Sequence, residues 1–141
     1  FADEQADPVL VAADLLSQAE HGADSQVLLV STSAAVLAAT EEALAQQLAA
    51  LPRRDFAAAA LKNSKAVYVA TDAEAMDLLN AYSPEHLILN CGNAMQLAEK
   101  VVNAGSVFLG PWSCESAGDY ASGTNHTLPT NGYARAYSGV S

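Results

Sequence analysis

Positive charge is scarce in this chain of 141 residues. It contains 6 lysines and arginines against 16 aspartates and glutamates, so its formal net charge is −10 with neutral histidines. Such a charge repels phosphate backbones, and the basic side chains form no stripe beyond the neighbours Arg53 and Arg54. Nucleic acid is therefore excluded as an expected partner.

Long apolar runs and cysteine motifs are also missing. The longest uninterrupted apolar stretches, such as residues 56–61, are far shorter than the roughly 18 residues that a membrane-spanning helix requires. Cys91 and Cys114 lie far apart, so neither a disulfide framework nor a thiolate zinc site is predicted. We expect no membrane partner and a cytoplasmic location. Because the first residue is Phe and no signal peptide pattern follows, we expect that the N-terminus was cut.

Short apolar blocks alternate with alanine-rich segments of helical periodicity up to residue 110. Strands are predicted at 27–32, 65–71, 86–90 and 105–110, and helices at 8–21, 33–51, 55–62, 72–82 and 94–102. Pro8 suits the first turn of its helix, Gly22 suits a C-cap, Pro52 ends the second helix, and Thr71 or Asp72 begins the fourth.

Continuous apolar strands that alternate with helices are typical of a parallel sheet covered on both faces. The predicted fold class is α/β and Rossmann-like: a mostly parallel sheet of about four to five strands, with helices on both faces and a long irregular C-terminal segment. We expect a single domain segment over residues 1–141, with an α/β body at 1–110 and an irregular segment rich in Gly, Ser and Asn at 111–141. Trp112 is expected to pack that segment against the body. No glycine-rich phosphate-binding loop is present in the sequence.

The first group of possible ligands is Gln18-Ala-Glu-His21, at the end of the first predicted helix. Residues 18 and 21 are three positions apart, so they share a side of the helix and could chelate one ion. The alternative is a solvated last turn in which His21 complements the helix dipole. On ligand chemistry alone Glu20 is preferred over Gln18, since carboxylates are common zinc ligands.

A second group is Ser83-Pro84-Glu85-His86, just before a predicted strand. Neighbouring Glu85 and His86 could divide general acid and base roles, although the alternative is a polar loop. In open parallel sheets ligands bind beyond the carboxyl ends of strands, whereas this pair precedes its strand. Either the strand runs in the opposite direction or the site lies at an unusual edge.

A third group lies in the segment 115–126, where Asp119 offers a carboxylate and His126 an imidazole after the last predicted strand. A flexible loop without a ligand is the alternative. Cys114 has no neighbouring base and is not predicted to be a nucleophile.

Three segments together resemble the histidinol dehydrogenase family: LLSQAEHG at 15–22, SPEHLI at 83–88 and AGSVFLGPWSCESAGDYASGTNHTLPT at 104–130. The resemblance covers essentially the whole chain, at about a third of the family's length. It implies oxidation of L-histidinol through the aldehyde to L-histidine, in the last steps of histidine biosynthesis, with one zinc ion and two molecules of NAD.

The resemblance also implies roles for individual residues. Gln18, His21 and Asp119 match zinc ligands, which would make the preference for Glu20 wrong. Glu85 and His86 match the catalytic acid/base pair: His86 takes the proton of the alcohol and Glu85 activates water. Gln18, His21, His86 and Asp119 would also bind substrate, and His126 is expected to lie near the site.

Parts of the family pattern are absent from this sequence. The fourth zinc ligand, a histidine from the partner subunit of a homodimer, would follow this segment, and the NAD-binding residues would precede it. We therefore expect the isolated chain to be inactive, as a segment of a longer multidomain enzyme. A non-catalytic metal-binding or interaction module that keeps only the fold is the alternative.

Overall fold

The structure is a computed structural model, and it describes residues 1–114, 129 and 132–136. The chain divides into two compact units. The N-terminal unit covers Ala2–Tyr68, and the C-terminal unit consists of Phe1 together with Val69–Ser141. The single domain segment expected from the sequence stays a prediction.

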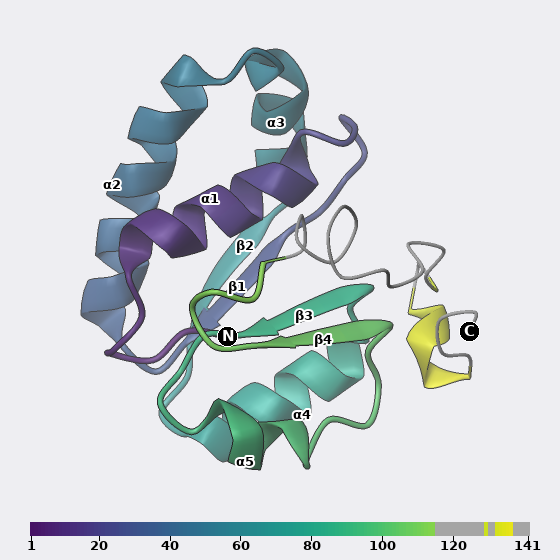
Figure 1. The fold of residues 1–141 in the computed structure, drawn as a ribbon. Helices are drawn as coiled ribbons and strands as arrows, with labels where there is room; N and C mark the ends of the chain where they lie inside the picture. The colour runs from purple at the N-terminus through teal and green to yellow at the C-terminus, as the bar shows by residue number, and fades with distance from the viewer. Residues whose placement is uncertain (115–128, 130–131, 137–141) are drawn as a thin grey trace. The chain divides into compact units, whose positions relative to one another are not determined.

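The N-terminal unit contains helices α1 (Pro8–Ala19), α2 (Ala34–Ala50) and α3 (Arg54–Leu61) and strands β1 (Leu28–Ser31) and β2 (Lys65–Tyr68). The two strands pair in parallel, with Leu28 opposite Lys65, and Ala2 forms a parallel bridge with Ser31. The three helices pack on one another, and α2 also contacts both strands (Figure 1).

Local sequence signals explain where these helices begin and end. The Asp7 carboxylate accepts a hydrogen bond from Val9 N, and Pro8 occupies the first helical position of α1. The Ser33 hydroxyl caps α2 by accepting from Val36 N at 3.3 Å. Leu51 ends α2 in an extended conformation, as expected for a residue before proline.

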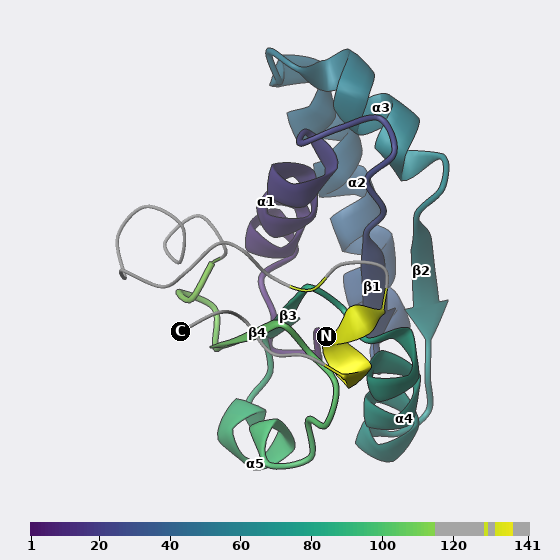
Figure 2. The same ribbon diagram turned by 90° about the vertical axis from the view of Figure 1, so that its right-hand side faces the viewer.

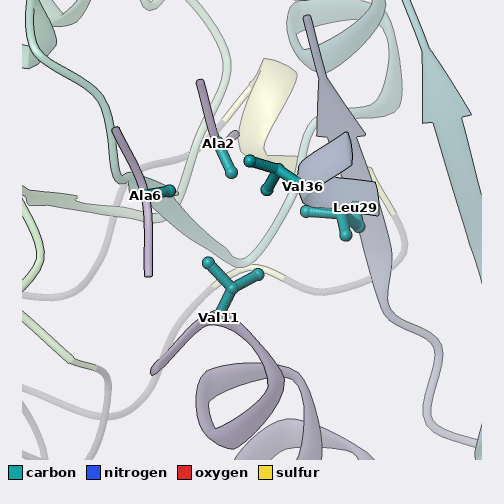
Figure 3. Close-up of a cluster of buried hydrophobic side chains, with 5 residues drawn as sticks. All are labelled: Ala2, Ala6, Val11, Leu29 and Val36. Carbon is teal, nitrogen blue, oxygen red and sulfur yellow. The ribbon is translucent and has the colours of Figure 1, made fainter. Parts of the chain in front are cut away.

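Small apolar side chains fill the core of the N-terminal unit. One cluster joins Ala2 and Ala6 of the leading segment to Val11 of α1, Leu29 of β1 and Val36 of α2 (Figure 3). A second cluster connects Leu16 and Ala19 of α1 with Ala57 and Ala60 of α3 and with Val27. The alanines allow the helix axes to approach closely, because they add little side-chain volume.

The C-terminal unit contains helices α4 (Asp72–Tyr82) and α5 (Ala94–Ala98), strands β3 (His86–Leu89) and β4 (Ser106–Leu109), and a short 3₁₀ helix at Tyr133–Arg135. β3 and β4 pair in parallel, and both views show α4 and α5 on the same side of them (Figures 1 and 2). Thr71 caps α4, since its hydroxyl accepts from Glu74 N while the Glu74 carboxylate accepts from Ala70 N.

The mixed α/β class with parallel strands is confirmed, but the sheet of four to five strands is not. The strands pair in two two-stranded sheets, and β2 is largely exposed rather than covered on both faces. The helix predicted at 94–102 is also too long, since α5 ends at Ala98 and irregular turns follow. In the described residues no helix combines the length and hydropathy needed to cross a membrane.

Candidate active site

Gln18 and His21 both lie at the end of α1. The helix stops at Ala19, and the backbone N–H of His21 donates to the Gln18 carbonyl at 3.3 Å. Gln18 therefore belongs to the last helical turn and is partly buried, whereas His21 lies just beyond the helix and is exposed. Gly22 is not the predicted C-cap, because Glu20 closes the helix in a right-handed conformation.

The side-chain oxygen of Gln18 has an unusual environment. Oε1 is buried and has no hydrogen-bond partner in the described part of the chain. Leaving a buried carbonyl oxygen without a donor costs about 1–3 kcal/mol, and a bound cation is one way to remove that cost. The oxygen thus fits a metal ligand, with the His21 imidazole three residues further along.

The described residues do not complete a metal centre by themselves. Among residues 1–114, 129 and 132–136, no group of three or more His, Cys, Asp or Glu side chains could hold an ion. Asp119, the third predicted ligand, and His126, the predicted site-lining residue, lie outside the described residues.

Glu85 and His86 lie at the amino end of β3, after a tight turn. The turn begins at Ser83, which follows α4 and has left-handed backbone angles, φ 57° and ψ 63°. A residue with a Cβ in this region costs about 1–2 kcal/mol. Ser83 is held there because its N–H donates to the Leu79 carbonyl at 2.9 Å and its hydroxyl donates to the Asn80 carbonyl at 3.0 Å.

Pairing with β4 holds the backbone of the same turn from the other side. Gly105 N donates to the Pro84 carbonyl at 3.0 Å, and Ser106 N donates to the Glu85 carbonyl at 2.8 Å. His86 is opposite Ser106 in the parallel register. β3 therefore does not run in the opposite direction from its neighbour, and the pair lies at an amino edge of the strands.

Gly105 is required by this close approach. A Cβ built on it would lie 2.5 Å from the Glu85 carbonyl oxygen and 3.3 Å from Cδ of Pro129. No real Cβ occupies such a position, so the backbone of Glu85 and the start of β4 can meet only at a glycine.

The imidazole of His86 is partly buried beside an aromatic ring. Its centroid lies 6.0 Å from that of Phe108, with the planes tilted by 36°. Its Nδ1 is buried and has no hydrogen-bond partner in the part of the chain that the structure describes. The described residues thus leave one polar atom of His86 without a hydrogen bond, which costs about 1–3 kcal/mol for a buried group.

Two side chains without a predicted role, Asn80 and Arg135, support this turn. Asn80 accepts from Val102 N at 2.8 Å and donates to the Lys100 carbonyl at 3.0 Å, which ties the segment after α5 to α4. Arg135 donates from Nε to the Ser83 hydroxyl at 3.0 Å and from Nη2 to the Ala81 carbonyl. Burial raises the pKa of the Tyr82 phenol, in the last turn of α4.

Other predictions about the tail have different outcomes. Trp112 does not pack against the body as expected, since 84% of it is exposed. Neither Cys91, which is buried, nor Cys114 forms a disulfide within the described residues. The N-terminal unit contains Gln18 and His21, and the C-terminal unit contains Glu85 and His86.

Comparison with known proteins gives a consistent result. A family model described as histidinol dehydrogenase matches residues 1–141. The chain is similar to histidinol dehydrogenase from Bacteroides thetaiotaomicron, with 63% identity over 100% of this chain and 33% of that protein. It is also similar to the chloroplastic histidinol dehydrogenase of Arabidopsis thaliana, with 58% identity over 100% of this chain and 30% of that one.

A solved structure shows the same similarity. The crystal structure of histidinol dehydrogenase from Elizabethkingia anophelis matches with a TM-score of 0.98 and 56% identity, over 99% of this chain and 32% of that chain. The chain thus spans about a third of the length of the relatives that it matches.

Proposed function

The chain belongs to the histidinol dehydrogenase family, and we propose that a protein of full family length carrying it oxidises L-histidinol through the aldehyde to L-histidine. The observation within the chain that best supports this proposal is the buried oxygen of Gln18, which has no hydrogen-bond partner among the described residues and lies one helical turn before a histidine. Zinc would supply a positive charge that orients the substrate at Gln18, His21 and Asp119, and NAD would be the hydride acceptor in both oxidations.

In the first oxidation, His86 acts as the general base. A ring nitrogen of His86 accepts the proton of the substrate hydroxyl as the carbinol carbon loses hydride, which leaves the aldehyde. The imidazole lies beside the Phe108 ring, and among the described residues its Nδ1 has no hydrogen-bond partner.

In the second oxidation, Glu85 activates water. Its carboxylate accepts a proton from the water molecule, whose oxygen bonds to the aldehyde carbon, and loss of a second hydride gives the carboxylic acid. The backbone of Glu85 is held by the Ser106 N–H, so the carboxylate extends from a fixed point.

Gln18, His21 and Asp119 would hold the zinc ion, and with His86 they would also bind the substrate. His126 is proposed only to lie near the site. A homodimer would supply a fourth ligand from the partner subunit, so the isolated 141-residue chain is proposed to be inactive. The proposed location is the cytoplasm, while the relative from Arabidopsis thaliana is named chloroplastic.

One experiment tests the catalytic assignment. In the full-length protein, Glu85→Gln keeps the size of the side chain but removes its ability to accept a proton from water. We expect the variant to lose oxidation of L-histidinal while retaining NADH formation in the first step. Equal rates of aldehyde oxidation in the variant and the wild type would exclude Glu85 as the base.

A second experiment tests the metal assignment. In a zinc titration, Gln18→Ala and Asp119→Ala should each lower affinity by at least about 10- to 100-fold, the range seen for even indirect partners of a metal site. Gln46→Ala is the control, since Gln46 is exposed and its side-chain amide donates to its helical neighbour Glu42 at 3.4 Å. Unchanged affinity in the Gln18 variant would remove that residue from the site.

A non-catalytic metal-binding module is the alternative function. The Gln18 oxygen would support it equally well, because the oxygen indicates a cation and not a reaction. Zinc binding by the full-length wild type without NADH production from L-histidinol would favour the module over the enzyme.

A further inference from the structure

We propose that Arg135 is a positioning residue that orients Glu85 and His86 through the turn at Ser83. This inference rests on the proposed function, because it takes Glu85 and His86 as the acid/base pair. Arg135 lies 49 or more positions from that pair in the sequence, in the short 3₁₀ helix Tyr133–Arg135.

The guanidinium group contacts the end of α4 at two points. Nε donates to the Ser83 hydroxyl at 3.0 Å, and Nη2 donates to the Ala81 carbonyl. The Ser83 hydroxyl in turn donates to the Asn80 carbonyl at 3.0 Å. Arginine is suited to this arrangement because its planar fork places two donors in fixed relative positions.

The contact also adds a positive charge at the C-terminal end of α4. α4 has no basic residue in its last turn, and its last carbonyls carry the negative end of the helix dipole. Arg135 supplies a positive charge there from a distant part of the chain, and it does so at the one non-glycine residue with positive φ in the described chain, Ser83.

Only Pro84 separates Ser83 from Glu85, and its ring restricts the backbone between them. The next carbonyls are already bound by Gly105 N and Ser106 N of the β4 side. A change in the backbone angles of Ser83 would therefore either move the side chains of Glu85 and His86 or break those two hydrogen bonds. Arg135 thus holds the turn at Ser83 and Ala81, and the β4 side holds it at the carbonyls of Pro84 and Glu85.

The test compares arginine variants in the full-length protein, with steady-state NADH production from L-histidinol. Arg135→Met keeps most of the apolar stem but removes both donors, and Arg135→Lys keeps the charge with a single ammonium group. Arg54→Met is the matched control, since the Arg54 side chain is exposed and its Nε lies 3.9 Å from Oδ1 of the exposed Asp55.

We expect Arg135→Met to lower kcat by about tenfold or more, because small misplacements of catalytic groups have effects of this size. KM for NAD should stay within about twofold, since no NAD contact is assigned to this turn. Arg135→Lys should recover part of kcat, and Arg54→Met should match the wild type.

A double-mutant cycle with Ser83→Ala separates positioning from general stability. If Arg135 acts through the Ser83 hydroxyl, its replacement has a smaller effect on kcat in the Ser83→Ala background. If Arg135→Met does not fold, the lysine variant and its cycle with Ser83→Ala give the same comparison.

The outcomes distinguish this inference from the proposed function. A folded Arg135→Met with wild-type kcat, or effects of the two substitutions that simply multiply, would overturn the positioning role while leaving the enzyme assignment intact. A full-length wild type that makes no NADH from L-histidinol would refute the proposed function itself.

Discussion

Replacing Gly105 with alanine tests how closely β3 and β4 must approach to hold the catalytic turn. The new Cβ would lie 2.5 Å from the Glu85 carbonyl oxygen, and it needs roughly 0.9 Å more to reach ordinary contact at 3.4 Å. The obstructing atom belongs to the backbone, so no side-chain rotation can relieve the overlap.

The expected cost follows from the two contacts that such a shift disturbs. Overpacking of this kind costs about 1–3 kcal/mol, and loss of the Ser106 N hydrogen bond to Glu85, now 2.8 Å long, adds about 0.5–1.5 kcal/mol. Local opening of the β3–β4 pair should therefore become easier by about 1.5–4.5 kcal/mol, which is roughly a 10- to 2,000-fold faster exchange of its amides.

The assay is hydrogen exchange in the full-length protein, observed at the amides of Gly105 and Ser106. Gly22→Ala is the control, because its Cβ would meet a side-chain oxygen, Oδ1 of Asp24 at 2.8 Å, which can rotate away. Neither Gly22 nor Gly105 has positive φ, so the comparison isolates the steric effect. Equal protection of the β3–β4 amides in Gly105→Ala and wild type would refute the close-approach argument.

Three further perturbations have defined outcomes. Ser33→Ala removes the cap of α2 and should weaken amide protection in the first turn of that helix by about 1 kcal/mol. Ser33→Asp should retain the protection, because its carboxylate can accept the same hydrogen bond. Equal loss of protection in both variants would show that the hydroxyl does not cap the helix. Leu89→Ala empties a fully buried position in β3 and should cost about 2–5 kcal/mol in the same exchange experiment, with Val102→Ala, at a 76% exposed site, as a near-neutral control. Tyr82 has a pKa raised above 10.0 by burial, so its contribution to stability is fully present below pH 10 and is lost as the pH rises through the folded-state value. Tyr82→Phe should therefore reduce the alkaline fall in stability above pH 10, and identical pH profiles for the variant and the wild type would contradict that assignment.

The order and type of the elements could be predicted from the sequence because their signals are local. Asp7, Ser33 and Thr71 are helix caps that act within three residues, and each begins a helix in the structure. Apolar blocks likewise mark the four strands of the described residues to within one residue at each end, except that β2 ends at Tyr68, three residues before its predicted end. The errors, at Gly22 and at the end of α5, are at helix C-termini, where several local hydrogen-bond patterns compete.

The candidate site was found less by periodicity than by resemblance. Ligand chemistry alone favoured Glu20 over Gln18, because carboxylates are common zinc ligands and residue type says nothing of which oxygen is buried. Within the described residues, Oε1 of Gln18 is buried and has no hydrogen-bond partner, and its role as a ligand stays a prediction. Asp119 and His126 lie outside the described residues, so their roles stay predictions.

The sequence by itself determined the residue types available for chemistry and the secondary structure that carries them, since caps, periodicity and family motifs are encoded over short stretches. Only the tertiary structure decided how the turn before Glu85 and His86 is held. Its strained residue is a serine, its close neighbour is Gly105, and its side-chain support comes from Arg135. These contacts join residues up to 54 positions apart, and no local pattern could predict them because they depend on strand register and on where the chain returns.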